Sequence, residues 1–231
     1  LTTMTFNNNT FITYTNLRTF NNTISLRFRT TLKEGVIFAW DGLFLSSTLF
    51  STVELHQGMV YITYPQGDSS NAVTAQHHFP YLVNDASWHE ILVVQTEYLY
   101  VELKSSKCPL SSSCSLNVTY TVGAPAKTIA IGKPGSSIFK MKRTISDAAW
   151  IGCMQDITIN SVVIVPGSAQ ANMTQVNVQQ SCPRTAQCHA DSCSRRGTCV
   201  DLWNKYRCDC NRPYYGQDCE QSYTPATFAT G

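Results

Sequence analysis

Apolar and polar residues alternate along most of the chain, and this alternation governs the prediction of its fold. Between residues 23 and 165 the pattern has a period of two, and helical periodicity is nearly absent. Ile24, Leu26 and Phe28 fall on one face of an expected strand. Residues 35–40 form a continuous apolar run, which is typical of a strand covered on both faces. The pattern predicts an all-β domain.

Turn-forming residues separate many further short strands. The expected strands and strand pairs are residues 53–55 with 59–64 across Gly58, 88–94 with 98–103, 128–132, and 154–160 with 162–165. Short strands at near-regular spacing, separated by Gly, Pro, Asn, Asp and Ser, favour an antiparallel sandwich of two curved sheets. From typical strand and turn lengths we expect about twelve to fourteen strands.

Composition narrows the class of protein. The 231 residues are 43% hydrophobic and 14% charged, as in a globular protein, and suffice for a sandwich-sized domain and a small module. A formal net charge of +2 gives no electrostatic case for a nucleic-acid partner. No apolar run approaches the roughly 20 residues that span a bilayer. Because no signal peptide opens the chain at Leu1, we expect a segment of a longer secreted or membrane-anchored protein.

The end of the chain is rich in cysteine. Six of the ten cysteines lie between residues 188 and 219, with the spacing C-x4-C-x5-C-x8-C-x-C-x8-C. So short a segment holds too few large apolar residues to offset the chain entropy of ordering it, so disulfide bonds must stabilise it. Dense cysteines also indicate an oxidising compartment.

The other four cysteines are expected to form two further bridges. Cys108 and Cys114 would close a small ring around a polar connector. A bridge between Cys153 and Cys182 would enclose about 30 residues, worth roughly 3.5 kcal/mol in the chain-entropy model. The residues alone leave the crossed pairings of these four cysteines open.

Four N-glycosylation sequons agree with the extracellular address that the cysteines indicate. The acceptor asparagines are Asn8, Asn21, Asn117 and Asn172. One sequon arises easily by chance, whereas four sequons together with paired cysteines favour an extracellular protein. Four accidental sequons in a cytosolic protein are the alternative.

The cysteine-rich segment resembles an EGF-like domain. The C-x-C at Cys208 and Cys210, with Gly197 before the third cysteine and Gly216 before the last, carries the resemblance. The resemblance implies first-to-third, second-to-fourth and fifth-to-sixth pairing. The implied bridges are Cys188–Cys199, Cys193–Cys208 and Cys210–Cys219.

The first part of the chain resembles a laminin G-like domain. The segments that carry the resemblance are residues 35–38, 53–55 with Gly58, 84–89, 129–132 and 151–157. Together the two resemblances imply an all-β fold, a laminin G-like antiparallel β-sandwich of the jelly-roll type followed by a small disulfide-rich EGF-like module. The expected domains are residues 1–183 for the sandwich, 184–220 for the EGF-like domain and 221–231 for the lead-in to a further module.

Two segments are similar to the extracellular region of the Crumbs family. They are residues 199–216, and Trp150 to Cys153. Membership would imply a single-pass protein of the apical plasma membrane that acts in epithelial polarity, with ectodomain contacts between neighbouring cells.

The EGF-like segment holds two candidate modification sites. In that family an O-fucose acceptor stands directly before the third cysteine, and here Thr198 occupies that place. An unmodified turn threonine is the alternative. Asp201 and Tyr206 match the family pattern for hydroxylation, which makes Asp201 the candidate residue.

The same resemblance raises the question of calcium. Calcium-binding EGF-like domains supply carboxylates before the first cysteine, but residues 184–187 offer none and begin with Arg184. A calcium ion takes six to eight oxygen ligands, so calcium is not favoured and we expect no cofactor. Some laminin G-like domains bind calcium at a rim, where Asp68 aligns loosely. A solvated turn aspartate is favoured there, so Asp68 is only a weak metal candidate.

Further surface residues admit two interpretations. Lys133, Lys140, Lys142 and Arg143 form a loose basic stretch that could bind a sulfated glycan, although a solvated strand edge is favoured. Adjacent Tyr214 and Tyr215 could contact a partner, or one of them could pack under Trp203.

Catalytic motifs are not recognisable, so we do not expect an enzyme. No histidine stands at metal-ligand spacing from carboxylates or thiols, and no nucleophile-elbow or phosphate-loop motif is present. Adjacent His77 and His78 would point to opposite faces of a strand. A catalytic triad assembled from distant residues stays open, because triads are recognised by geometry.

We therefore expect a non-enzymatic extracellular recognition module of a Crumbs-like apical transmembrane protein in cell polarity and adhesion. It would bind a protein on the same or a neighbouring cell, with another copy of itself as one option, and would meet the membrane only through parts outside this segment. The alternatives are a lectin-like domain that binds glycans or heparan sulfate, and a passive ectodomain spacer.

Overall fold

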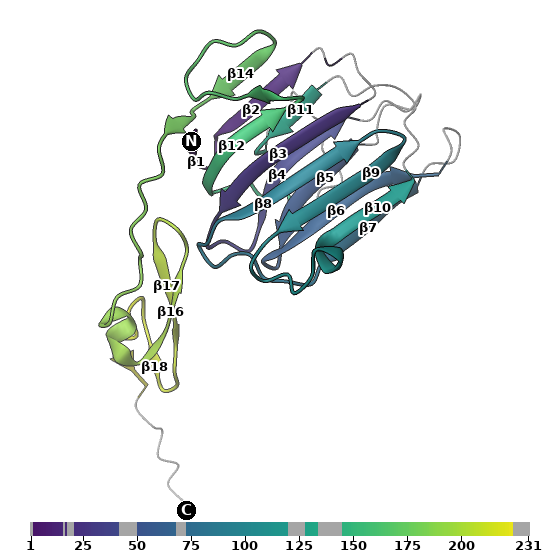
Figure 1. The fold of residues 1–231 in the computed structure, drawn as a ribbon. Helices are drawn as coiled ribbons and strands as arrows, with labels where there is room; N and C mark the ends of the chain where they lie inside the picture. Colours follow the sequence, from purple (N-terminus) through teal and green to yellow (C-terminus); the bar gives the residue numbers. More distant parts are fainter. Residues whose placement is uncertain are drawn as a thin grey trace, which may run out of the picture. The chain divides into compact units, whose positions relative to one another are not determined.

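The computed structural model describes residues 2–15, 17, 21–41, 50–67, 73–119, 128–133 and 145–223. The chain divides into two compact units, Leu1–Cys182 and Pro183–Gly231, one residue before the expected boundary. Figure 1 shows strands in both units, and the helical structure of the described residues is limited to short 3-10 turns. Among the described residues no helix is long and apolar enough to cross a membrane.

The first unit is a sandwich of two antiparallel sheets, as the sequence predicts. In order across the first sheet, sheet A, its strands are β10 (Ser115–Thr119), β9 (Tyr98–Lys104), β8 (His89–Gln95), β3 (Asn22–Arg29), β12 (Gly152–Ile159), β1 (Thr3–Phe6) and β15 (Gln179–Gln180), with β13 (Val162–Val163) paired to β12. In sheet B they are β14 (Met173–Val176), β2 (Phe11–Thr15), β11 (Thr128–Ile131), β4 (Gly35–Asp41), β5 (Phe50–His56), β6 (Met59–Gln66) and β7 (Val73–Phe79). All strand neighbours run antiparallel, which confirms the predicted fold class.

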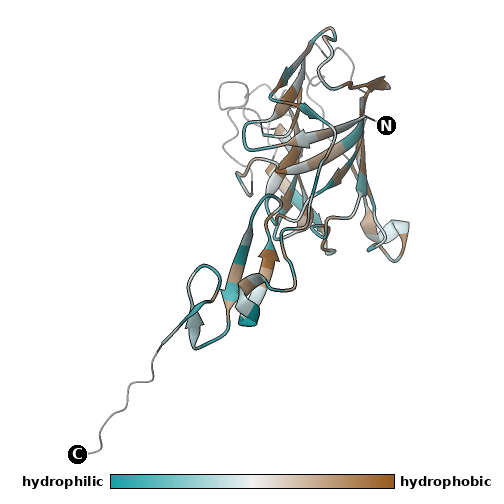
Figure 2. Cartoon of the chain, turned by 90° about the vertical axis from the view of Figure 1, so that its left-hand side faces the viewer, coloured by the Kyte–Doolittle hydropathy of each residue, from teal (hydrophilic) through white to brown (hydrophobic). Residues whose placement is uncertain are grey.

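The core lies between the two sheets and follows the alternation of the sequence. On β3, Ile24, Leu26 and Phe28 are buried, whereas the residues between them are at least partly accessible. The Phe28 ring meets the Trp150 ring edge-on, with centroids 5.6 Å apart. Each fully buried aliphatic or aromatic side chain contributes roughly 1.5–3 kcal/mol. Figure 2 shows brown and teal residues side by side along the sandwich strands, as this one-sided burial requires.

The hairpin of β5 and β6 shows how local sequence sets the register. Gln57 and Gly58 form the two-residue turn, with φ of 54° and 81°. Positive φ at both positions is typical of the turn that matches strand twist. A Cβ at Gly58 would lie 2.5 Å from Oδ1 of Asn84, so glycine is required for space as well as conformation. The hairpin therefore confirms the prediction made for residues 53–64.

Within the expected domain of residues 1–183, the sandwich has strands outside residues 23–165, where the sequence shows its period of two. Strands β1, β2, β14 and β15 lie before residue 23 or after residue 165, which brings the described strands of this unit to fifteen rather than twelve to fourteen. β1 and β2 consist largely of Thr and Phe beside an Asn-rich turn, and β14 is half polar. β2 buries two successive residues, Ile12 and Thr13, and β14 and β15 contain no fully buried residue, so these strands lack a clear one-sided apolar pattern.

The second unit has the disulfide-bonded hairpins of an EGF-like domain. β16 (Gly197–Asp201) pairs with β17 (Tyr206–Cys210), and β18 (Tyr214–Tyr215) pairs with β19 (Gln221–Ser222). A 3-10 turn, Ser192–Arg195, precedes β16. Because β19 lies within residues 221–231, the module continues past the expected boundary at residue 220, and the lead-in begins later.

Five disulfide bridges join the cysteines of the described residues. They are Cys108–Cys114, Cys153–Cys182, Cys188–Cys199, Cys193–Cys208 and Cys210–Cys219. This pairing matches the expected one throughout, and the crossed alternatives do not occur. No cysteine of the described residues is free.

Candidate functional site

An aspartate and an arginine meet at the start of the EGF-like module. Oδ2 of Asp201 accepts hydrogen bonds from Nη2 of Arg184 at 2.7 Å and from the Gln187 N–H at 3.0 Å. Oδ1 accepts one from the Trp203 N–H at 2.9 Å. The Arg184 guanidinium also lies 4.8 Å from the centroid of the Trp203 ring, which is 6% exposed. The Asp201 carboxylate is therefore held by donors from the module itself.

This arrangement does not fit a calcium ion. Burial alone would raise the pKa of Asp201, but the N–H groups of Gln187 and Trp203 and the Arg184 guanidinium outweigh it and lower the pKa. The Arg184 guanidinium already supplies the positive charge that a calcium ion would bring to the Asp201 carboxylate. One carboxylate engaged in this way cannot supply the six to eight oxygens that calcium requires. Calcium independence stays a prediction.

The two candidate modification residues lie on the same strand. Thr198 is exposed on β16, opposite Asp209 of β17. Asp201 ends the strand, and its side chain is 19% exposed. Exposure leaves the Thr198 hydroxyl accessible to an enzyme, whereas the Asp201 carboxylate is largely enclosed. O-fucosylation and hydroxylation both remain predictions.

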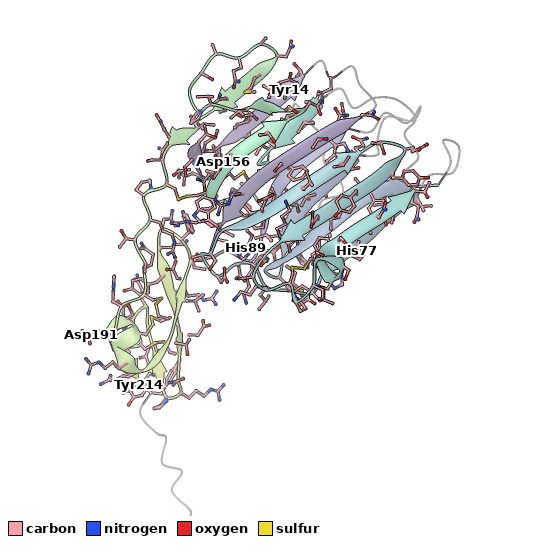
Figure 3. The ribbon with its side chains drawn as sticks, in the orientation of Figure 1. Tyr14, His77, His89, Asp156, Asp191 and Tyr214 are labelled. Carbon is pink, nitrogen blue, oxygen red and sulfur yellow. A yellow bond between two sulfur atoms is a disulfide. The ribbon has the colours of Figure 1, made fainter. Side chains whose placement is uncertain are left out.

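Aromatic side chains gather on the second hairpin of the EGF-like module. The Arg196 guanidinium lies 4.7 Å from the centroid of the Tyr214 ring, and the rings of Tyr215 and Tyr223 stack with centroids 4.3 Å apart. Tyr214 is labelled in Figure 3. Tyr214 thus contacts Arg196, and Tyr215 contacts Tyr223. The Trp203 ring is contacted by the Arg184 guanidinium.

The four sequon asparagines are exposed. Asn8 lies in the turn between β1 and β2, Asn21 directly precedes β3, Asn117 lies on edge strand β10, and Asn172 directly precedes β14. Strands β4 to β7 of sheet B carry no sequon. Glycan occupancy remains a prediction, but every acceptor is accessible to the modifying enzyme.

Only part of the basic stretch lies in the described residues. Nζ of Lys133 lies 2.6 Å from Oδ1 of Asp147, so this ammonium is already paired. Lys140, Lys142 and Arg143 lie outside the described residues, as does Asp68. Within the described residues, Lys133 alone does not form a binding site for a sulfated glycan.

A row of rings crosses the outer face of sheet B. Tyr61 stacks on His78 with centroids 4.9 Å apart and meets His56 edge-on at 5.3 Å. Nδ1 of His56 lies 3.0 Å from Oε2 of Glu34. His77 points to the opposite face, where its ring contacts Phe79. The prediction that His77 and His78 face opposite ways is therefore correct.

A buried histidine joins two connectors at one end of the sandwich. Nε2 of His89 lies 3.0 Å from Oδ1 of Asp85, and Nδ1 lies 2.8 Å from Oγ of Ser105. Nζ of Lys107 pairs with the other oxygen of Asp85 at 3.0 Å. Burial would raise the pKa of Asp85, but the bonds from Ser87, Lys107 and His89 outweigh it and keep the pKa below its ordinary value.

The order carboxylate, imidazole, hydroxyl is also that of a hydrolase triad. Here His89 is 1% exposed and packs against Phe28, with ring centroids 5.6 Å apart. The Ser105 hydroxyl accepts the Lys107 N–H at 3.1 Å and so closes a turn. The cluster ties the connector before β8 to the one after β9, and Figure 3 labels His89 in this region.

A second buried group lies on the side of β5 that faces away from the core. Oε1 of Glu54 accepts the Ile145 N–H at 2.8 Å, and Oε2 accepts the Ser146 N–H at 3.3 Å. Glu54 is fully buried, and burial raises its pKa above the ordinary value, partly offset by these hydrogen bonds. The carboxylate therefore fastens residues 145–146 across the outer face of sheet B.

Sequence reasoning missed the His89 cluster, the role of Glu54 and the involvement of Tyr223. Asp85 and His89 are four residues apart in the chain, which gave a usable signal, but Ser105 joins them only through the pairing of β8 and β9. Glu54 alternates with Val53 and Leu55 as a surface residue would, so its burial depends on a distant segment. The sequence predicts that Tyr223 belongs to the lead-in to a further module, whereas it contacts the EGF-like hairpin.

Comparison with known families matches both units. The Laminin G domain family matches residues 28–162, which is more than half of the chain. The EGF-like domain family matches residues 188–218. Both matches agree with the division into a sandwich and a disulfide-rich module.

Curated relatives and solved structures agree with this assignment. The chain is 29% identical over 218 residues to protein crumbs homolog 2 of Mus musculus, covering 90% of this chain and 15% of that protein. It is 27% identical over 254 residues to cadherin EGF LAG seven-pass G-type receptor 2 of Mus musculus, covering 96% of this chain and 8% of that protein. The chain thus spans a small part of each relative.

Among solved structures, the LG1-3 region of the laminin alpha2 chain matches with a TM-score of 0.60 and 15% identity, over 80% of this chain and 35% of that one. At this identity the match shows the fold alone. The chain therefore belongs to the Laminin G domain family and continues into an EGF-like module, with homology to Crumbs proteins over most of its length.

Proposed function

We propose that the chain is an extracellular recognition module of a Crumbs-like protein that acts in cell adhesion and polarity. The observation that carries the proposal is the tandem of laminin G sandwich and EGF-like module, with homology to protein crumbs homolog 2 over 90% of the chain. Five disulfides and four exposed sequons support an extracellular setting. Anchoring by a single span in the apical membrane is part of the proposal.

The module acts by presenting surfaces to a protein partner and carries out no reaction. The carboxylate–imidazole–hydroxyl arrangement at His89 has its histidine buried and its serine engaged in a turn. A nucleophile needs an accessible hydroxyl beside a site for the substrate. We therefore assign the His89 cluster to the stability of the sandwich.

The outer face of sheet B over β6 and β7, beside the part that residues 145–146 cover at Glu54, is a favoured contact surface within the sandwich. Its strands β4 to β7 carry no sequon, whereas the four exposed acceptors lie elsewhere. Bulky glycans block close packing, so a partner meets the surface that lacks them. Tyr61 and His78 lie on this face beside each other, and aromatic residues are enriched at protein interfaces. The partner that binds this surface could be a second copy of the chain.

The test is a binding assay with the glycosylated chain displayed at high density on fluorescent beads. The beads are mixed with epithelial cells and, separately, with beads that carry the same chain. We expect binding to the cells, and mutual clustering of the beads if the partner is a second copy. Replacing Tyr61 and His78 by Glu should reduce cell binding, whereas Ser112→Glu, at an exposed position in the 3-10 turn Ser111–Cys114 and outside every sequon, should not.

The outcomes separate this function from its alternatives. Persistent failure of the beads to bind cells or to cluster would favour a passive spacer. Retention on a heparin column above physiological salt would favour the glycan-binding alternative. Lys133 is already paired with Asp147, which gives that alternative no support from the described residues.

A further inference from the structure

The EGF-like module contains a surface depression of about 600 Å³. We call it the tyrosine cup, and its lining residues are Cys210, Arg212, Pro213, Tyr214, Tyr215 and Tyr223. The volume lies within the range of roughly 300–1,000 Å³ that is typical of binding pockets. Three of the six lining residues are tyrosines, so aromatic rings that carry hydroxyl groups make up much of the lining.

The cup is held open by backbone pairing. Tyr215 of β18 pairs with Gln221 of β19, and the Tyr223 N–H donates to the Pro213 carbonyl at 3.1 Å. These bonds position the Tyr223 ring on the Tyr215 ring at 4.3 Å. Ring positions fixed before a partner arrives reduce the entropy lost on binding.

The rings of the cup remain accessible although they are large. Tyr215 is 37% exposed and Tyr223 is 65% exposed. Adjacent exposed aromatic rings, unlike a single exposed apolar side chain, indicate an interaction site. Tyrosine is also among the residues that dominate binding energy at protein interfaces.

The charge of the cup is positive. Arg212 lines it, and the Arg196 guanidinium lies 4.7 Å from the centroid of the Tyr214 ring. Neither Asp nor Glu is among the lining residues. The Glu220 carboxylate, which is not among the lining residues, accepts hydrogen bonds from the Asp218 N–H at 3.0 Å and from Nε2 of Gln221 at 3.3 Å.

We propose that the tyrosine cup binds an acidic, extended segment of a partner protein. Planar or proline side chains of that segment would stack on Tyr215 and Tyr223, and its carboxylates would approach Arg212 and Arg196. Arginine pairs with carboxylates in a planar geometry that lysine cannot reproduce. Two guanidiniums are too few for a sulfated polysaccharide, which needs an extended array of cations. The partner class, a protein, rests on the function proposed above.

The experiment measures binding of the whole chain to a soluble random copolymer of glutamate and tyrosine, by fluorescence anisotropy at physiological salt. Poly-glutamate and heparin are the comparison probes. The variants are Arg212→Glu and Tyr223→Ala, and the charge-matched control is Lys205→Glu in the turn between β16 and β17, outside the cup. One-dimensional NMR of each variant verifies that the module remains folded.

We expect the chain to bind the copolymer more tightly than poly-glutamate. Each cup variant should lower the affinity for the copolymer by about tenfold or more, as for a residue that dominates an interface. Lys205→Glu should change the affinity by less than about threefold, as for a charge at the rim of an interface. Equal losses in Lys205→Glu and Arg212→Glu, tighter binding of heparin than of the copolymer, or no binding of the copolymer would each overturn the proposal.

The result is independent of the bead assay. If the beads bind cells while the cup variants bind the copolymer as the wild type does, the recognition function stands and the cup inference fails. If the cup variants no longer bind the copolymer and the wild-type beads do not bind cells, the cup binds acidic segments and the proposed adhesion function fails.

Discussion

Nη2 of Arg184 lies 2.7 Å from Oδ2 of Asp201, and the same guanidinium covers the Trp203 ring. Arg184 is four residues before the first cysteine of the EGF-like module, and Asp201 follows the third. The ion pair thus connects the residues that flank the Cys188–Cys199 loop, and its positive charge comes from the chain itself. Because this cation is part of the chain, we expect the contact to be independent of metal concentration.

Arg184→Ala should loosen the start of the EGF-like module, because it leaves the largely buried Asp201 carboxylate without its cation. We expect a loss of about 1–3 kcal/mol of local stability, the cost of removing a partner from an enclosed charged hydrogen bond. Hydrogen exchange of the Gln187 and Trp203 amides, followed by NMR, measures this loss.

Arg184→Lys is the matched control for that variant. It keeps the charge but loses the planar contact with the Trp203 ring, so we expect faster exchange than in the wild type and slower exchange than in Arg184→Ala. For the wild type, millimolar calcium and a chelator should give the same exchange rates. A calcium-dependent slowing of the Trp203 amide would show that an ion competes with Arg184.

Glu54→Gln should change how the stability of the sandwich depends on pH. Burial raises the pKa of Glu54 in the folded chain, so folding favours the protonated form. The contribution of Glu54 to stability is therefore fully present below its ordinary pKa of 4.5 and decreases as pH rises through the folded-state pKa. Glutamine does not titrate and lacks this slope.

Urea unfolding between pH 4 and pH 8, followed by tryptophan fluorescence, measures the difference. The stability of the wild type minus that of Glu54→Gln should fall as pH rises. Glu97→Gln, the same change at an exposed turn, is the matched control. A difference between wild type and Glu54→Gln that grows with pH would contradict the role assigned to burial.

His89→Phe should destabilise the sandwich strongly. The phenyl ring fills the space of the imidazole but leaves Asp85 and Ser105 without the hydrogen bonds that His89 makes at 3.0 and 2.8 Å. Because one of the two partners is a carboxylate, we expect a loss of about 2–4 kcal/mol in the free energy of unfolding. Thermal unfolding by calorimetry gives the value.

His78→Phe provides the control, since His78 is exposed on β7 and stacks on Tyr61. We expect its free energy of unfolding to lie within about 0.5 kcal/mol of the wild type, as for most surface changes. Similar losses in His89→Phe and His78→Phe would show that the His89 cluster does not stabilise the fold.

Replacing Cys153 and Cys182 by Ser together should lower the free energy of unfolding of the sandwich. The bridge closes a loop with a sequence separation of 29 residues, which corresponds to about 3.5 kcal/mol in the chain-entropy model. Chemical unfolding measures the loss. The paired change at Cys108 and Cys114, with a separation of 6, should cost less, and a larger loss there would contradict the entropic argument.

The elements that the sequence predicts well are those in which one face alone carries the apolar residues. Ile24, Leu26 and Phe28 define β3 without any tertiary information, and Gln57-Gly58 defines the turn between β5 and β6. The cysteine spacing likewise identifies the EGF-like module, because the small number of apolar residues there leaves disulfides as the means of stabilisation.

The sequence fails where a residue takes its role from a partner far away in the chain. The sequence predicts Glu54 to be a surface residue. In the structure residues 145–146 cover it, and Ile145 is 91 positions further along the chain. Ser105 reaches His89 because β8 and β9 pair, and Tyr223 reaches Tyr215 because β19 pairs with β18. Each of these contacts depends on a strand register that periodicity alone does not determine.

The central claim is that this chain recognises a protein, and treating cells with enzymes before bead binding tests it most directly. One sample of cells is treated with trypsin, and another with heparinase and sialidase. We predict that trypsin abolishes binding of the wild-type beads and that the glycosidases leave it within about twofold of untreated cells, since the contacts proposed are those of a protein interface. Binding that survives trypsin and disappears after the glycosidases would contradict the account.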